Sequence, residues 1–454
     1  MTGFIGPRYS FVVSGPALVL AASALGGCVH YAPDPLSAVM KAAPLPSDPI
    51  FVRGYGGAGD SKLAIDLGAP LSEAAIASLA VITNPDLKAQ RARAGISNAQ
   101  VFAAGLMPDP TISVGIDHLL SGADPVDALT GALGLNLNSL RTRAVVRQKA
   151  QAELRQVHSD LLWAEWQTAG QARLQAVRID ALQRRFALAE EGRKAADRLL
   201  AHYAAAAGRG DVAADPLQTA RIAASGAADV ARQTEKDLAT ARLQLNRLLG
   251  LPPETILTVA PMIRAEALPD ADRLFAIAQS ERADLRALRD GYAAQEAAMR
   301  KAVLDQFPTL DLTINGGRDT GRNVTLGPAI GFTLPLWNRN RGGIAVEKAT
   351  REALKAEYEA RLFQTRADIA DAVSALAIAR GQYAAQQASL ISATHFAATS
   401  RNAASRGDLS DASAQAAEQV ARDRRLLSEQ SAQDMSEQVI ALELLTGVPR
   451  ERWE

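Results

Sequence analysis

The sequence predicts a mainly helical chain with four short strands, built by internal duplication. Most of the 454 residues lie in alanine-rich segments of helical periodicity, each half has two short stretches of alternating polar and apolar residues, and landmarks recur at a constant spacing. Lys and Arg together number 49, as do Asp and Glu. With this balance no overall field favours an acidic partner, and nucleic acid is not an expected partner.

The first residues predict a lipoprotein signal peptide over 1–27. Arg8 precedes an apolar run, Phe11 to Leu25, that ends in small residues and Cys28, the only cysteine of the chain. The run is short for a transmembrane helix, and small residues before a cysteine suit cleavage ahead of a lipidated thiol. The alternative is a general secretory signal with a buried cysteine. Val29 is not acidic, which favours the outer membrane, and the proline-rich and glycine-rich stretch 28–70 predicts a lipid-anchored extended tether.

No stretch after Cys28 offers 18 consecutive apolar residues, so the sequence predicts no transmembrane helix after the signal. If the protein spans a membrane, it must do so with strands, because only helices and closed barrels satisfy their backbone groups in lipid.

Landmarks indicate two repeats, 71–268 and 269–454. Asn84-Pro85-Asp86-Leu87 matches Arg282-Ala283-Asp284-Leu285 at an offset of 198 residues (284 − 86), and Gly210-Asp211 matches Gly407-Asp408 at 197 (407 − 210). Pro110, Gly134 and Gly250 have counterparts at the same two offsets. This order predicts an internal duplication with one residue lost in a loop.

Each half is predicted to contain a helix that stops at a proline, a β-hairpin, a helix of about 65 residues and a returning helix. An Asp after the Gly of the turn is expected to cap the returning helix, and the two shorter helices should run end to end alongside the long one. The expected ranges are 84–106, 111–116, 133–137, 143–207 and 211–249 in the first half, and 282–305, 309–314, 329–334, 340–405 and 408–446 in the second.

Apolar residues seven apart in the second long helix predict a coiled-coil seam. They are interspersed with alanines, which would allow close packing of the partner helix. The residues are Leu362, Ile369, Leu376, Tyr383 and Leu390, with Ala372, Ala379 and Ala393 between them.

Four strands per chain are too few for a membrane barrel, since about eight is the smallest number seen, and an open sheet edge is not tolerated in lipid. The sequence therefore predicts that the chain oligomerises. Three chains would supply twelve strands around a pore, continued by a hollow tube of helices. The alternative is a small soluble sheet.

Four segments carry a recognisable pattern: Asn84-Pro85-Asp86-Leu87, Met107-Pro108-Asp109-Pro110-Thr111, Leu248-Leu249-Gly250 and the run from Leu334 to Gly342. Together they resemble the TolC-like outer-membrane factor family, the outer membrane efflux proteins, over about residues 70–450. The resemblance implies a mainly α fold with a β-barrel portion: a homotrimer whose β-barrel, with 4 strands per protomer and 12 in total, contacts outer-membrane lipid and is continued by a long periplasmic α-helical barrel. It also implies a passive channel, localised to the cell outer membrane and extending into the periplasm, that works with a periplasmic adaptor (membrane fusion) protein and an inner-membrane proton-driven pump. The last segment is most similar to the heavy-metal cation efflux branch; multidrug efflux and type I protein secretion remain alternatives.

The run after the fourth predicted strand is expected to connect strand to helix near the membrane edge. Its residues of interest are Pro335, Trp337, Asn338, Arg339, Arg341 and Gly342, with Gly342 expected to allow close packing where the helix begins. A connector without a direct function is the alternative. The first repeat lacks the proline.

The two Gly-Asp turns are expected at the end of the helices remote from the strands. In the resembled family this end is the adaptor-docking tip and the channel constriction, so the candidates for a gate there are Asp211, Asp215, Asp408, Asp411, Arg209, Arg401 and Arg406. Helix capping is the alternative role for Asp211 and Asp408.

The sequence predicts neither an enzyme nor a cofactor or metal site. The five histidines lie far apart, the cysteine is single, and no phosphate loop or nucleophile motif occurs. A protein of another class, a periplasmic coiled-coil adaptor or structural lipoprotein, would also be anchored and helical, but it would carry one hairpin and not a duplicated unit.

Overall fold

The computed structural model of the protein describes residues 31–36, 50–53, 62–118, 120–121, 127–260 and 270–453. The chain divides into a unit Met1–Ala42 and a unit Ala43–Glu454, and all the helices and strands described below belong to the second unit. The expected signal peptide and Cys28 lie outside the described residues.

Both halves of the larger unit contain the same order of elements, helix-helix-strand-strand-long helix-returning helix. The first half comprises α2 (Glu73–Thr83), α3 (Pro85–Gly105), β3 (Thr111–His118), β4 (Asp127–Asn136), α4 (Leu137–Gly208) and α5 (Ala214–Leu249). The second comprises α6 (Ala271–Glu281), α7 (Ala283–Leu304), β5 (Leu310–Asp319), β6 (Val324–Phe332), α8 (Arg341–Ser405) and α9 (Asp411–Thr446), followed by a 3-10 turn, η1 (Arg450–Arg452).

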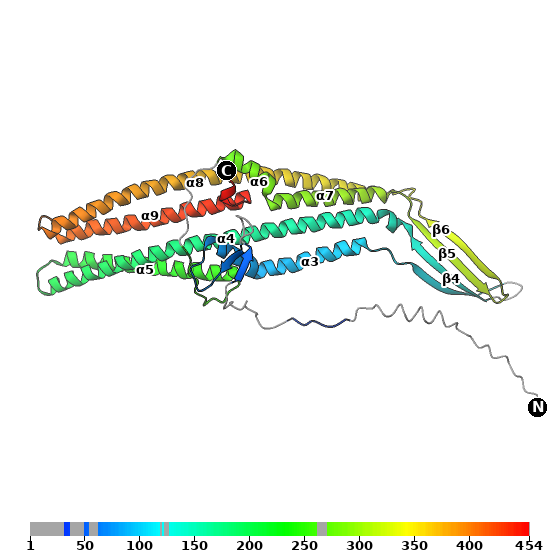
Figure 1. The fold of residues 1–454 in the computed structure, drawn as a ribbon, viewed down its shortest axis with the longest axis horizontal. Coiled ribbons are helices and arrows are strands. Elements are labelled where there is room, and N and C mark those ends of the chain that lie inside the picture. The colour runs from blue at the N-terminus through cyan, green and yellow to red at the C-terminus, as the bar shows by residue number, and fades with distance from the viewer. Residues whose placement is uncertain are drawn as a thin grey trace, which may run out of the picture. The chain divides into compact units, whose positions relative to one another are not determined.

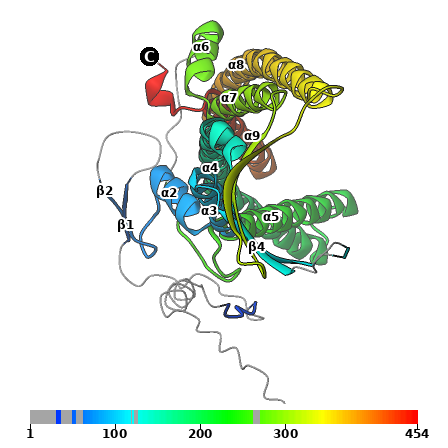
Figure 2. The ribbon, with the colours of Figure 1, turned by 90° about the vertical axis from the view of Figure 1, so that its right-hand side faces the viewer.

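The long helices α4 and α8 run past the shorter ones within the larger unit (Figure 1). With 72 and 65 residues they extend about 110 and 100 Å at 1.5 Å per residue. Helices α3 and α5 both pack on α4, and α7 and α9 both pack on α8, as the sequence predicted. Since α4 also packs on α7 and α9, the helices form a layer ordered α3/α5, α4, α7/α9, α8 (Figures 1 and 2).

The expected tether 28–70 contains structure that the sequence analysis did not predict. Two short antiparallel strands, β1 (Ile50–Arg53) and β2 (Lys62–Ile65), lie within it, and Ile65 is fully buried in the core of the first half. The folded part of the chain therefore begins before residue 70, within the range that was predicted to be an extended tether. None of the described helices is long and apolar enough to cross a membrane.

The 11-residue helices α2 and α6, which begin 198 residues apart (271 − 73), were not predicted from the sequence. Their N-cap residues, Ser72 and Asp270, accept hydrogen bonds from the backbone N–H groups of Ala75 and Arg273 at 3.2 and 2.9 Å. A cap residue ahead of an apolar run was the available signal, and it recurs at the same offset (270 − 72).

In each half, one residue joins the start of the second short helix, α3 or α7, to the end of the returning helix, α5 or α9. The Asn84 side chain caps α3 and donates through Nδ2 to the carbonyl of Leu248, at 2.8 Å, near the end of α5. At the equivalent joint Arg282 donates to the carbonyl of Leu445 at 3.0 Å and to both carboxylate oxygens of Asp284 at 2.9 and 2.7 Å. The repeated segments that begin at Asn84 and Arg282 are thus the places where α3 and α7 meet the ends of α5 and α9.

Two hydrophobic cores, one in each half, lie around these joints. The first packs α2 between α4 and α5; the second packs α6 against α8 and α9. Ile369, Leu376, Ala372 and Ala379 of the predicted seam are buried in the second core. The seam is therefore confirmed at its centre.

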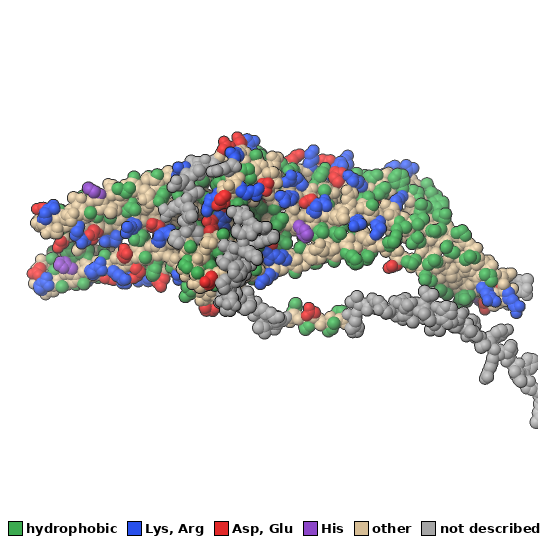
Figure 3. Space-filling view, viewed as in Figure 1, with side chains coloured by type: hydrophobic (Ala, Val, Ile, Leu, Met, Phe, Trp, Pro, Cys, Tyr) green, Lys and Arg blue, Asp and Glu red, His purple; other side chains and the backbone are tan. Residues whose placement is uncertain are grey.

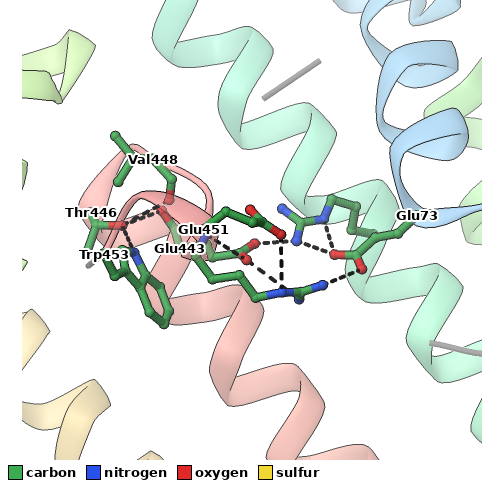
Figure 4. A network of polar contacts seen from close by, with 8 residues as sticks. Glu73, Glu443, Thr446, Val448, Glu451 and Trp453 are labelled. Carbon is green, nitrogen blue, oxygen red and sulfur yellow. Dashed lines mark hydrogen bonds and ion pairs between the residues drawn. The ribbon is translucent and has the colours of Figure 1, made fainter. Parts of the chain in front are cut away.

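An ion-pair cluster around the buried Glu443 joins the two halves (Figure 4); its other members, Glu73, Arg173 and Arg450, are partly buried. Arg173 on α4 donates from Nε to Glu73 on α2 at 2.6 Å and pairs with Glu443 on α9. Arg450 pairs with Glu73 at 3.2 Å and donates its backbone N–H to Glu443. Burial raises the pKa of Glu443, and the charges of Arg173 and Arg450 oppose that rise. Figure 4 also shows Trp453 bonded to Thr446 next to this cluster.

Candidate functional site: a two-faced sheet, a helical tip and a connector

The sheet has one polar and one apolar face. Its strands are antiparallel in the order β3-β4-β5-β6, and residues paired across the strands lie on the same face. On the apolar face, Ile112 of β3 pairs with Leu133 of β4, which pairs with Ile314 of β5. On the other face, Ser113 pairs with Ala132, which pairs with Asn315. The side chains of Ile112, Leu133 and Ile314 are 77, 46 and 46% exposed. Figure 3 shows apolar side chains gathered over the strands, in contrast to the charged helices.

A single sheet with one apolar face this open to its surroundings has no core of its own on that side.

The strands at the two edges of the sheet are β3 and β6, which each pair on one side only. The helical layer has the same order, so α8 lies at the edge that follows β6, and α3 and α5 lie at the edge that precedes β3. Unpaired strand edges offer backbone N–H and C=O groups to another strand.

The two turns at the far end of the helices from the sheet have the same backbone structure (Figure 1). Gly210 and Gly407 have φ of 78° and 81°, the left-handed region that favours glycine. The next residue, Asp211 or Asp408, donates its N–H to the carbonyl of Ala206 or Ala403, in both cases at 2.9 Å. These are matching Schellman turns, which end α4 and α8.

The expectation that Asp211 and Asp408 cap the returning helices is wrong. Helix α9 is capped by Ser410, and α5 follows Ala213 without a side-chain cap. Each aspartate instead accepts a hydrogen bond from the arginine two residues earlier, Arg209 Nε at 2.7 Å and Arg406 Nε at 3.0 Å. The Schellman turn places the aspartate before the helix starts, where its side chain meets the arginine of the same turn.

The remaining tip candidates have different surroundings. Asp215 and Asp411 lie in the first turns of α5 and α9, where a negative charge stabilises the helix end. Arg401 on α8 pairs with Glu418 on α9, which bridges neighbouring helices as expected. Arg209 and Arg406 do not bridge helices within the chain. All four members of the two turn pairs are more than half exposed, so the pairs contribute little to stability.

The connector, residues 333–340, has a defined backbone structure. Leu336 donates its N–H to Leu334 at 2.9 Å, and Arg341 donates its N–H to Asn338 at 2.9 Å. Arg339 and Asn340 are both left-handed, with φ of 47° and 51°, a conformation that costs about 1–3 kcal/mol for a non-glycine residue. The Asn340 side chain offsets part of this cost by donating to the carbonyl of Ala302 on α7 at 2.8 Å.

The connector also differs from one expectation. A Cβ built on Gly342 would meet no atom of the chain within 4 Å, whereas one built on Gly343 would lie 2.9 Å from Asn340 Nδ2. Within the chain, the close approach is therefore made by Gly343 and not by Gly342. Pro335 follows the end of β6, as expected, and Trp337 is 86% exposed.

The first repeat has no such connector, because α4 begins directly after β4. Its arginines have partners instead: Arg141 donates to the carbonyl of Leu304 at 3.2 Å and Arg143 to that of Gly105 at 3.1 Å, at the ends of α7 and α3. In the second repeat Asn340 performs this role alone.

Among the described residues, no group of three or more His, Cys, Asp and Glu could hold a metal ion. His118, at the end of β3, pairs with Asp127 of β4.

Comparisons with known proteins agree with this architecture. Residues 274–448 match the outer membrane efflux protein family. A crystal structure of CusC, one of a set that concerns conformational changes during folding and transmembrane channel formation, superposes with a TM-score of 0.68 at 16% identity. The match covers 82% of this chain and 91% of the CusC chain. The fold is that of solved outer-membrane channels. The resemblance that the sequence indicated is therefore confirmed.

Two further outer membrane channels have the same fold. The open state of MtrE from Neisseria gonorrhoeae covers 91% of this chain and 97% of that one, with a TM-score of 0.65 at 16% identity. The CmeC outer membrane channel of Campylobacter jejuni gives a TM-score of 0.68 at 16% identity over 82% of this chain and 84% of that one. No curated protein sequence matches the chain.

Proposed function

We propose that the chain is the outer-membrane channel of a tripartite efflux system and conducts its cargo passively. The observation that carries the proposal is the sheet, which has a polar and an apolar face and two unpaired edges. Lipid would cover the apolar face, and water would fill the space on the polar face. The same arrangement supports a conduit and not an enzyme.

Closure requires more than one copy. If β6 of one chain pairs with β3 of the next, three chains supply twelve strands and leave no edge. The helical layer fits this arrangement, because α8 would then lie beside α3 and α5 of the neighbouring chain. The outcome is a homotrimer with a β-barrel in the outer membrane and an α-helical barrel in the periplasm.

Native mass measurement and planar-bilayer recording test this proposal together. We expect a trimer that conducts ions through one shared pore per three chains. A monomer that keeps the four-stranded sheet, or a trimer that never conducts, contradicts the proposal. A periplasmic adaptor or structural lipoprotein, the candidate of another class, would give the second result.

The tip is the proposed docking site for a periplasmic adaptor, which would link the channel to an inner-membrane proton-driven pump. Its support is the repeated turn: each chain presents two matching Schellman turns, each with an exposed arginine–aspartate pair. Three chains would present six such turns in one ring. Exposed pairs exchange partners at small cost, which suits a surface that must open on docking.

We also propose that the tip carboxylates favour cations. Replacing Asp408 and Asp411 with Asn should reduce cation preference in planar bilayers, and replacing Arg401 and Arg406 with Ala should raise the resting conductance. The second expectation rests mainly on Arg401, which joins α8 to α9 through Glu418. If all four replacements leave conductance, selectivity and export unchanged, the gate lies elsewhere.

For the cargo we propose heavy-metal cations, with multidrug efflux or type I protein secretion as the alternative. The connector sequence supports the first, and CusC is one of several channels with this fold. Export-dependent resistance to metal salts, compared with resistance to drugs in the same deletion strain, separates them.

Lipid anchoring at Cys28 completes the proposal and rests on the sequence before that residue. Mass spectrometry of the mature N-terminus should find a diacylated Cys28. Cys28→Ser should weaken membrane attachment while leaving trimers, because the barrel has its own apolar band.

A further inference from the structure

We infer that the connector of the second repeat is a lipid-binding site. Leu334, Leu336 and Trp337 would enter the periplasmic leaflet of the outer membrane, and Arg339 and Arg341 would bind the headgroups of anionic phospholipids. This inference rests on the proposed membrane position of the sheet.

The apolar residues of the connector continue the apolar face of the sheet. Leu310 and Phe332 form the last pair of β5 and β6, and both belong to that face. Beyond this pair, Leu334 and Leu336 are 57 and 59% exposed and Trp337 is 86% exposed. A tryptophan at the end of an apolar band is the usual arrangement at a membrane–water interface.

Two exposed arginines follow the tryptophan directly. Within the described residues, neither Arg339 nor Arg341 has a recorded ion pair, whereas Arg141 and Arg143 of the first repeat are bonded to helix-end carbonyls. Arginine is suited to bind phosphate because its guanidinium group can donate two parallel hydrogen bonds. The order of apolar, aromatic and basic residues therefore matches the order of acyl chain, interface and headgroup.

The connector is also fixed in position before any lipid binds. The bond from Asn340 to Ala302 attaches the end of the connector to the last turn of α7, and two backbone hydrogen bonds within the connector define its turns. A fixed backbone reduces the entropy lost when the side chains bind.

Quenching of tryptophan fluorescence by brominated lipids tests the inference with the full-length protein in vesicles. The signal of Trp337 is the difference between the wild-type protein and Trp337→Phe. Trp163 and Trp166 lie on α4 at least 26 residues beyond its start, about 40 Å along the helix, and Trp453 is buried, so these three should remain unquenched. We expect Trp337 to be quenched, and more strongly by brominated phosphatidylglycerol than by brominated phosphatidylcholine.

The double variant Arg339→Gln/Arg341→Gln measures the headgroup contribution. A basic residue near an anionic surface strengthens binding about fivefold, so the preference for phosphatidylglycerol should fall towards none in this variant. The matched control, Arg221→Gln/Lys236→Gln, removes two exposed charges from α5 and should keep the preference.

Two results would overturn the inference. If Trp337 is not quenched in protein that conducts in bilayers, a neighbouring chain covers the connector and only this inference fails. If both double variants lose the preference equally, the arginines form no specific site. Protein that neither inserts nor conducts would instead refute the proposed channel function.

Discussion

Replacing Gly170 with Ala tests the packing between the two halves of the chain. Gly170 lies on α4, and a Cβ added there would overlap most closely with Cδ2 of Leu444 on α9 and would lie 2.7 Å from its Cγ and 2.9 Å from its Cδ1. Carbon atoms in contact are normally 3.5–4.0 Å apart, so the helices or the Leu444 side chain would have to move by roughly 1 Å. Overpacking of this kind costs about 1–3 kcal/mol, against a gain of about 1 kcal/mol from alanine in a helix.

Gly192 on the same helix is the matched control, because a Cβ there would meet no atom of the chain within 4 Å. Gly192→Ala should raise the free energy of unfolding by about 1 kcal/mol, so the two variants should differ by about 1–3 kcal/mol. Urea unfolding in detergent at fixed protein concentration, followed by tryptophan fluorescence, measures this difference. Trp163 and Trp166 lie within seven residues of Gly170 and report on the region (170 − 163).

A double-mutant cycle identifies the cause. In a Leu444→Ala background the overlapping atoms are absent, and Gly170→Ala should then stabilise the protein as much as Gly192→Ala does. If Gly170→Ala is as stabilising as the control in the wild-type background, α4 and α9 do not pack as described.

Two other replacements test the contacts that join the helices. Glu443→Ala should lower the free energy of unfolding by on the order of 3 kcal/mol, because it removes one of the partners of Arg173 at a buried site. Calorimetry should show a smaller loss of stability for Arg173→Met/Glu443→Leu, because that variant removes both charges. Asn84→Ala should cost about 2 kcal/mol in the same urea assay, since it removes the cap of α3 and a partner of the Leu248 carbonyl; an unchanged midpoint would show that the joint does not need this residue.

Much of the fold was predictable because its signals are local and long. The helical periodicity continues for about 65 residues in each half, and the alternation of Thr111 to Ile116 correctly assigned the two faces of β3. Pairs such as Gly210-Asp211 and Gly407-Asp408 located the turns, because a left-handed glycine is the usual end of a helix.

The role of the aspartates in these turns could not be read in the same way. A Gly-Asp sequence fits both an aspartate that caps the next helix and an aspartate that lies in the Schellman turn before that helix. Only the structure shows that Asp211 and Asp408 lie in the turn and bond to arginines. The short helices α2 and α6 were missed although their cap residues are a local signal, because 11 residues contain too few turns for a clear helical period. Their apolar residues pack on α4 and α8, which are far away in the sequence. Likewise, nothing local indicates that Glu73 and Arg450 meet in the cluster between the halves.

The duplication produced two copies of each helix, but two arginine–glutamate ion pairs that join α4 to α9 have no equivalent between α8 and α5. Arg178 on α4 binds Glu437 on α9 at 2.9 Å, and Arg184 binds Glu429 at 2.9 Å. At the offset of 197 residues, the corresponding positions on α8 and α5 are Ala375, Gly381, Thr240 and Arg232, which cannot form these bonds. In a ring of three chains, these two ion pairs would therefore join α4 to α9 within each chain and would have no equivalent where α8 of one chain meets α5 of the next.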